Sequence, residues 1–175
     1  MAAEELRSPV ILAHYVNTGA YSGHDWFYET AKWMAGKVSV PVAIHLDHGD
    51  SFERCMEMLK LGFTSIMFDG SALPVEENAA ATEAVARVCR SFGVPLEAEI
   101  GELCRLDDRG NKIGASNIAD PDVVRQYLKL CHPDSLAIGI GNAHGFYNGP
   151  VDIRVEVLEE CRKFTDIPFV LHGCT

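Results

Sequence analysis

The sequence lacks the marks of a secreted, membrane-bound or nucleic-acid-binding protein. No apolar run approaches the roughly 18 residues that span a membrane, and residues 1–8 lack the apolar core of a signal peptide. Basic residues are few, with 15 Lys and Arg against 25 Asp and Glu, so the net charge is −10. That charge argues against nucleic acid or an anionic membrane as the main partner. We therefore expect a soluble, cytoplasmic protein.

Three chemical signatures are also missing. The six cysteines form no CxxC pair, which disfavours a disulfide framework or a cysteine-type zinc site. No GxGxxG follows a candidate strand, which disfavours a dinucleotide-binding fold. No lysine follows a strand end as a Schiff-base enzyme would require. What remains is an ordinary globular composition, with 47% hydrophobic and 23% charged residues.

Short apolar strands alternate with amphipathic helices along the chain. The pattern predicts strands at residues 9–14, 41–49, 64–69, 94–100, 135–141 and 167–172. It predicts helices at residues 23–37, 74–92, 121–130 and 150–165, and a further helix from about residue 50. Such a βα repeat fits a barrel or a doubly wound sheet. We expect an α/β fold of the TIM (β/α)8 type: one partial barrel domain over residues 1–175, incomplete at both ends, with about six of the eight strands.

The stretch PVAIHLDHG, residues 41–49, ends in polar side chains that a buried strand does not need for packing. His45, Asp47 and His48 crowd its carboxyl end. In α/β folds, ligands and metals bind at the carboxyl ends of strands. The alternative for this stretch alone is a strand end with a capping Asp and two hydrogen-bonded histidines.

Four further strands end in a similar way. His144 and His172 are each followed by Gly, as His48 is, and two other strands end in Asp69 and Glu99. The parallel strands of a barrel would bring these groups to one rim. Three imidazoles that leave a fourth position open make a catalytic zinc site. A structural histidine is the alternative for any one of them, but it does not explain three in the same relative position.

Five segments carry a family resemblance: IHLDHGDSFE, IMFDGS, LEAEIG, GNAHGFY and LHGCT, in this order. They resemble the signature segments of the class II (metal-dependent) fructose-bisphosphate and tagatose-bisphosphate aldolase family. The resemblance implies a homodimer or higher oligomer. It also implies a TIM barrel that cleaves a phosphorylated ketose to dihydroxyacetone phosphate and an aldehyde, with Zn2+ stabilising the enediolate. By position it assigns zinc ligation to His48, His144 and His172, alternative or second metal positions to Asp69 and Glu99, and proton transfer to Asp47. A second divalent cation or a monovalent cation stays open.

Other segments match the family less closely. Residues 101–119 correspond to a mobile loop, and Asp107 stands there near the position of a usual Glu; a solvated acidic loop is the alternative. Asn148 replaces a usual Lys, and Gly173-Cys174-Thr175 replaces a phosphate-binding Gly-Gly-Ser. Two alternatives therefore stay open, a related aldolase or epimerase on another sugar, or a catalytically incomplete metal-binding fragment. The resemblance implies a place around the substrate for Gly145, Gly173, Cys174, Thr175 and His45.

Overall fold

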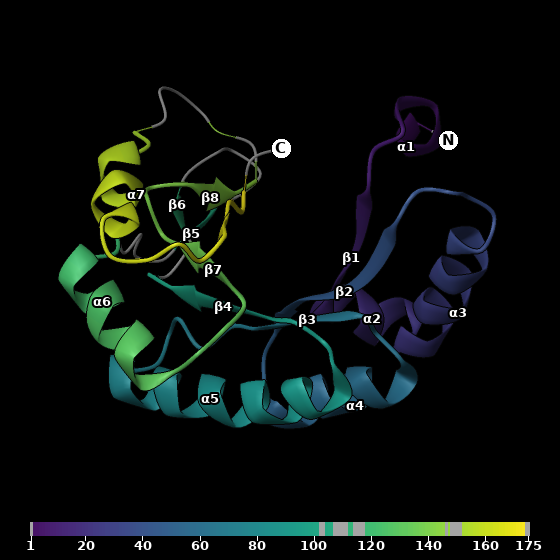
Figure 1. The fold of residues 1–175 in the computed structure, drawn as a ribbon, viewed down its shortest axis with the longest axis horizontal. Coiled ribbons are helices and arrows are strands. Elements are labelled where there is room, and N and C mark those ends of the chain that lie inside the picture. The colour runs from purple at the N-terminus through teal and green to yellow at the C-terminus, as the bar shows by residue number, and fades with distance from the viewer. Residues whose placement is uncertain are drawn as a thin grey trace. The chain divides into compact units, whose positions relative to one another are not determined.

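The computed structural model of the chain describes residues 2–101, 104–106, 112–113, 118–145, 147 and 152–173. The chain divides into two compact units. The first unit combines Met1–Asp69 with Ala84–Leu96, and the second combines Gly70–Glu83 with Glu97–Thr175. Both units contain strands and helices, and the six strands that the sequence predicts are separated by helices along the chain (Figure 1).

The first unit is built on three parallel strands. β1 pairs with β2 from Val10 opposite Val42 to Tyr15 opposite Asp47, and β2 pairs in turn with β3. The second half of α5 (Val75–Phe92) completes this unit. Its other elements are α1 (Ala2–Leu6), β1 (Val10–Tyr15), α2 (Val16–Ser22), α3 (His24–Ala35), β2 (Val42–Gly49), α4 (Phe52–Leu61) and β3 (Ser65–Phe68).

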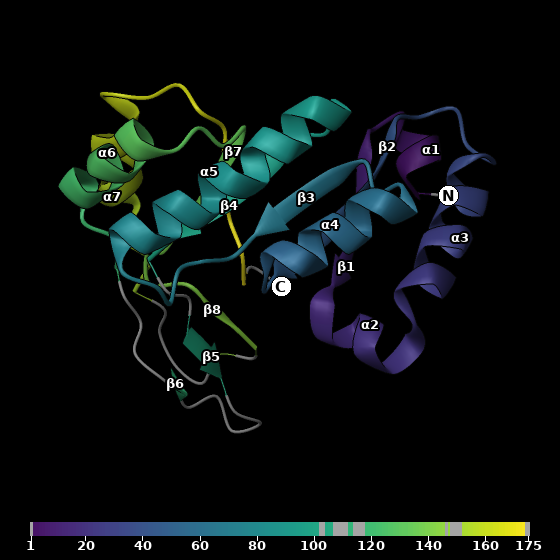
Figure 2. The same cartoon turned by 90° about the horizontal axis from the view of Figure 1, so that it is seen from below.

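Helix α4 shows how local sequence signals fix one element of this unit. Ser51 caps its amino end, because the hydroxyl accepts a 3.2 Å hydrogen bond from the backbone N–H of Arg54. Gly62 ends the helix in the left-handed conformation, with φ of 108°. Between these caps α4 buries Cys55, Met58 and Leu59 and contacts β2 and β3, and Figure 2 shows it running beside β3.

The second unit contains a parallel sheet and a small three-stranded sheet. In the parallel sheet β7 lies between β4 and β9, and in the small sheet β5 pairs with both β6 and β8. Asp120 caps α6, and Pro121 is its first residue, which is the start that the sequence predicts. The elements are β4 (Leu96–Ile100), β5 (Cys104–Leu106), β6 (Lys112–Ile113), α6 (Pro121–Leu130), β7 (Ser135–Ile138), β8 (Ala143–His144), α7 (Val155–Arg162), β9 (Phe169–Val170) and the first half of α5.

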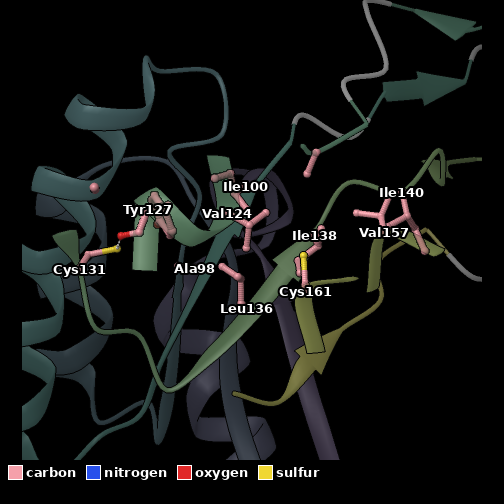
Figure 3. Close-up of a cluster of buried hydrophobic side chains, with 12 residues drawn as sticks. Ala98, Ile100, Val124, Tyr127, Cys131, Leu136, Ile138, Ile140, Val157 and Cys161 are labelled. Atoms are coloured by element: carbon pink, nitrogen blue, oxygen red, sulfur yellow. Dashed lines mark hydrogen bonds between the residues drawn. The ribbon is translucent and has the colours of Figure 1, made fainter. Parts of the chain in front are cut away.

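The core of the second unit lies between its parallel strands and its helices. Helices α6 and α7 contact each other, and their buried side chains meet those of β4 and β7 (Figure 3). Removing this much apolar surface from water is the main stabilising contribution to the unit. The cluster includes Ala98, Ile100, Val124, Tyr127, Cys131, Leu136, Ile138, Ile140, Val157 and Cys161.

All six predicted strands and all five predicted helices form, although several are shorter than predicted. Helix α2 was not predicted, and residues 101–119, expected to be irregular, contain the short strands β5 and β6. The single domain predicted over residues 1–175 stays a prediction. Among the described helices, none is both long and apolar enough to cross a membrane.

Candidate active site

A β-bulge in the first unit presents Asp47 and His48. Leu46 pairs with Ile66 and Gly49 pairs with Phe68, so two residues of β2 lie opposite the one residue of β3 between those partners. His48 takes φ of 51°, a left-handed conformation that is uncommon for a residue with a side chain. Such strain is found at functional sites, where the surrounding structure holds it.

Gly49 allows the chain to close this bulge. A Cβ at this position would lie 2.5 Å from the carbonyl oxygen of Met67, too close for any other residue. The carbonyl of Gly49 accepts a 2.9 Å hydrogen bond from the backbone N–H of Asp69. The glycine that follows His48 is therefore required by the close approach of β3, and it fixes the end of that strand where Asp69 lies.

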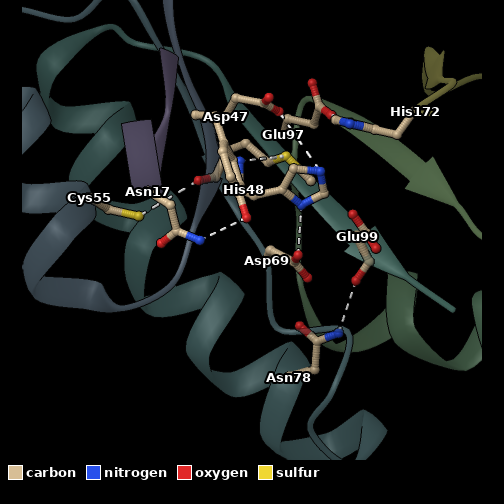
Figure 4. A network of polar contacts seen from close by, with 11 residues as sticks. Asn17, Asp47, His48, Cys55, Asp69, Asn78, Glu97, Glu99 and His172 are labelled. Atoms are coloured by element: carbon tan, nitrogen blue, oxygen red, sulfur yellow. Dashed lines mark hydrogen bonds and ion pairs between the residues drawn. The ribbon is translucent and has the colours of Figure 1, made fainter. Parts of the chain in front are cut away.

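The imidazole of His48 is oriented by a carboxylate. Its Nδ1 lies 2.7 Å from Oδ2 of Asp69, and the contact is visible in Figure 4. The nearest oxygen of Asp47 lies 3.9 Å from Nε2 on the other side of the ring. Because Nδ1 faces Asp69, metal coordination by His48 would use Nε2. His45, by contrast, is buried, and its Nδ1 lies 2.7 Å from the hydroxyl of Ser65.

The second unit brings together two of the predicted metal ligands. His144 is the last residue of β8 and His172 lies just after β9, and their rings meet edge to face with centroids 5.9 Å apart. A ring nitrogen of His144 lies within 4.8 Å of a ring nitrogen of His172. Two nitrogens bound to one tetrahedral zinc at 2.0–2.1 Å lie about 3.4 Å apart, which small ring rotations can reach. The pair therefore fits a zinc-type ion by both chemistry and spacing.

Glu97, which was not predicted as a site residue, lies beside a predicted metal ligand. Its Oε1 lies 2.8 Å from Nε2 of His172, and both side chains are about nine-tenths buried. A carboxylate behind an imidazole is the usual arrangement around a metal-bound histidine. The signal was present, because Glu97 and Glu99 are two residues apart on one strand and share a face.

Glu99 is held from behind by a buried polar network. The amide of Asn78 donates a 3.0 Å hydrogen bond to the backbone carbonyl of Glu99 (Figure 4). The hydroxyl of Thr82 in turn donates to Asn78 Oδ1 and lies 2.7 Å from the hydroxyl of Tyr127. The Glu99 side chain is 1% exposed. This network joins α5, α6 and the end of β4.

Glycines follow both histidines of the second unit. Gly145 and Gly173 take φ of 120° and 67°, values that favour glycine. A Cβ at Gly173 would also lie 2.3 Å from the carbonyl oxygen of Ala143. Three predicted site residues, Asp107, Cys174 and Thr175, lie outside the described residues.

The strongest pKa shift of a histidine lies away from these groups. Burial, with a smaller contribution from His24, lowers the pKa of His14 to about 4. His14 Nε2 lies 2.9 Å from His24 Nδ1, so the two rings form a partly buried hydrogen-bonded pair. Burial also raises the pKa of Cys55 to about 12 and of Cys131 to about 11, as expected for structural thiols.

Comparison with known proteins gives a consistent answer. The profile of the class-II fructose-bisphosphate aldolase family matches residues 1–175. A fructose-bisphosphate aldolase of Staphylococcus aureus is 39% identical over 181 residues, 99% of this chain and 62% of that protein. A 6-phospho-5-dehydro-2-deoxy-D-gluconate aldolase of Bacillus subtilis is 36% identical over 180 residues, 99% of this chain and 60% of that protein.

A solved structure is similar as well. The crystal structure of the YdjI aldolase from Escherichia coli K12 superimposes with a TM-score of 0.84 at 32% identity, covering 98% of this chain and 59% of that one. The predicted fold class, an α/β barrel of the TIM type present in part, is thereby confirmed. The chain spans about three fifths of the length of these relatives.

Proposed function

This chain belongs to the class II fructose-bisphosphate aldolase family, and from that membership we propose that it is a metal-dependent lyase. The reaction would be the reversible aldol cleavage of a phosphorylated ketose to dihydroxyacetone phosphate and an aldehyde. The observation that carries the proposal is the family match over residues 1–175. The names of the curated relatives, which are aldolases of phosphorylated sugars, support it.

We propose that His48, His144 and His172 hold one divalent ion, which we take to be zinc. The spacing of the imidazole pair in the second unit supports this. The carboxylates that orient two of these histidines, Asp69 beside His48 and Glu97 beside His172, also support the proposal. When bound, the ion would supply positive charge to offset the negative charge left on the substrate after the carbon–carbon bond breaks. Asp69 and Glu99 are proposed to serve a second or alternative cation.

Asp47 is the proposed proton-transfer group. It would take the proton from the C4 hydroxyl of the ketose during cleavage and return it during synthesis. The bulge supports this role, because it gives Asp47 a position on the strand that is not dictated by the alternation of core residues. Asp107 is proposed to bring a second carboxylate to the reaction.

The remaining predicted residues are proposed to line the substrate. The backbone N–H groups near Gly145 and Gly173 would bind a phosphate, because glycine permits close approach of the backbone. Cys174 and Thr175 would extend that contact, and His45 would lie beside the metal ligands. We further propose a homodimer or higher oligomer, as the resemblance implies, and a cytoplasmic location.

A second candidate is aldol chemistry on a different sugar phosphate. The relative named 6-phospho-5-dehydro-2-deoxy-D-gluconate aldolase is 36% identical to this chain, nearly as similar as the fructose-bisphosphate aldolase at 39%. In the sequence Asn148 stands in place of a lysine usual in the family, and Cys174 interrupts the usual phosphate-binding triplet. Both changes favour a substrate with a different phosphate arrangement.

Cleavage assays on the 175-residue chain, combined with metal analysis, test the proposal. Fructose 1,6-bisphosphate, tagatose 1,6-bisphosphate and 6-phospho-5-dehydro-2-deoxy-D-gluconate are compared before and after chelation and after zinc is restored. We expect about one zinc per chain and cleavage that the chelator removes. His172→Ala should lose both, whereas the matched variant His132→Ala should keep both, because the His132 side chain is 71% exposed. Cleavage that survives chelation, or no cleavage of any of the three sugars, would contradict the proposal.

A further inference from the structure

Of the two proposed metal ligands of the second unit, His144 ends a strand of one sheet and His172 lies just after a strand of the other. β8, which carries His144, pairs with β5, whereas β9, which precedes His172, pairs with β7. Within the described residues, no strand pairing joins β8 to β9. The spacing of the two imidazoles is therefore not set by a ladder of backbone hydrogen bonds, and other contacts must set it.

Asn142 supplies the first of these contacts. Its side chain is 1% exposed, and its amide uses both ends. Oδ1 accepts a 3.1 Å hydrogen bond from the backbone N–H of Ile140, and Nδ2 donates a 2.6 Å hydrogen bond to the carbonyl of His172. Because one end is held by its own chain segment, the other end fixes where the backbone of His172 lies.

Tyr147 supplies the second contact. Its hydroxyl accepts a 2.6 Å hydrogen bond from the backbone N–H of Ala143, the residue before His144. The same hydroxyl lies 2.9 Å from the carbonyl of Ala143 and 3.3 Å from the carbonyl of Gly173, the residue after His172. One phenol oxygen thus bridges the backbone beside both histidines.

We propose that Asn142 and Tyr147 are positioning residues that set the spacing of His144 and His172 for one metal ion. The inference rests on the metal site of the proposed function, and it adds how that site is built. Neither side chain ligates the ion in this account. Each acts through the backbone of a histidine, so that the two imidazoles are placed before the ion arrives, which lowers the conformational cost of binding.

Metal affinity tests the inference without any substrate. Zinc affinity is measured by competition with a chromophoric chelator, and the ligand geometry by the visible absorption of the cobalt-substituted chain. Asn142→Asp keeps the shape and the acceptor but loses the donor to His172, and Tyr147→Phe loses only the hydroxyl. We expect each to bind zinc about 10-fold more weakly or worse, with an altered cobalt spectrum and an unchanged circular dichroism spectrum.

Thr165→Val is the matched control. Thr165 accepts a 3.2 Å hydrogen bond from the backbone N–H of Ile167, so this variant also removes a side-chain-to-backbone bond near β9, but not one beside a histidine. It should match the wild type in zinc affinity and cobalt spectrum. Wild-type affinity and spectrum in both Asn142→Asp and Tyr147→Phe would overturn the inference, and so would an equal loss in the control.

The cleavage assay separates this inference from the proposed function. A wild-type chain that binds zinc but cleaves no sugar phosphate, with weakened binding in both variants, would overturn the aldolase proposal and support the positioning role. Cleavage by the wild-type chain, with unchanged zinc binding in both variants, would support the aldolase proposal and overturn the positioning role. A wild-type chain that binds no metal would overturn both.

Discussion

Replacing Glu97 by Gln should weaken zinc binding through His172. Glu97 Oε1 accepts from His172 Nε2 at 2.8 Å, in a place where both side chains are about nine-tenths buried. A carboxylate at this position would hold the proton on Nε2, so that Nδ1 would be the metal-binding nitrogen and would gain basicity. A glutamine has the same shape but no charge, and its amide group can also turn an NH2 toward the ring.

The expected loss is about 10-fold to 100-fold in zinc affinity, the usual effect of removing a carboxylate behind a ligating histidine. This corresponds to about 1.4 to 2.7 kcal/mol in binding free energy. The measurement is a chelator competition titration at constant pH and ionic strength. Glu83→Gln is the control, because Glu83 also pairs with a histidine of the same unit, His132 at 3.2 Å, which is exposed and not a proposed ligand. The control should bind zinc as the wild type does.

Two results would refute this reasoning. If Glu97→Gln bound zinc as tightly as the wild type, the carboxylate would not be tuning His172. If Glu83→Gln lost as much affinity as Glu97→Gln, the loss would reflect the charge or stability of the unit and not the contact with His172. Nitrogen-15 NMR of the zinc-loaded chain adds a direct check, because it shows whether Nδ1 or Nε2 of His172 binds the metal.

Other perturbations test the same structure at other points. Asp47→Ala should keep zinc but lower turnover by orders of magnitude, because it removes proton transfer and not coordination; loss of zinc would point to a structural role. Leu46→Ala should lower the free energy of unfolding by about 2 to 5 kcal/mol in denaturant titrations, because this side chain is fully buried, and a smaller loss would contradict tight packing. The free energy of unfolding should fall as pH drops from about 6.5 toward 4. Burial lowers the pKa of His14 to about 4, so the unfolded chain takes up the proton at a higher pH than the folded chain does. An unchanged pH dependence in His14→Gln would refute this. Gly173→Ala should weaken zinc binding, because its Cβ would lie 2.3 Å from the carbonyl oxygen of Ala143, and wild-type affinity would count against that clash.

The parts of the fold that repeat could be predicted from the sequence. Each predicted strand is a short apolar run, and a sheet that buries such runs needs little else to specify it. Helix α2 could not be predicted in this way, because Gly19 within it weakens the helical signal. The structure supplies the reason for that glycine: a Cβ there would lie 2.0 Å from the ring of His24. Packing against the rings of His14 and His24, and not helical propensity, determines this residue.

The candidate site residues could be singled out from the sequence, but their local geometry could not be predicted. His48, His144 and His172 could be singled out because each precedes a glycine at a strand end. The bulge at His48 could not be predicted, because it exists only in the pairing of β2 with β3. The sequence shows that Glu97 shares a strand face with Glu99, but it does not identify the partner of Glu97, which lies 75 residues away.

The bulge in β2 also bears on how this protein could diversify. Leu46 before the bulge and Gly49 after it keep their pairing partners on β3. The buried face of the strand therefore does not depend on which side chains stand at the two positions between them. Substitutions at Asp47 and His48 could therefore accumulate in a lineage without turning core residues outward. Losing one residue there would instead remove the bulge, because a single residue of β2 would then lie opposite the single residue of β3 between those partners. Selection can thus alter the side chains at these two positions one by one, while the length of the segment stays fixed.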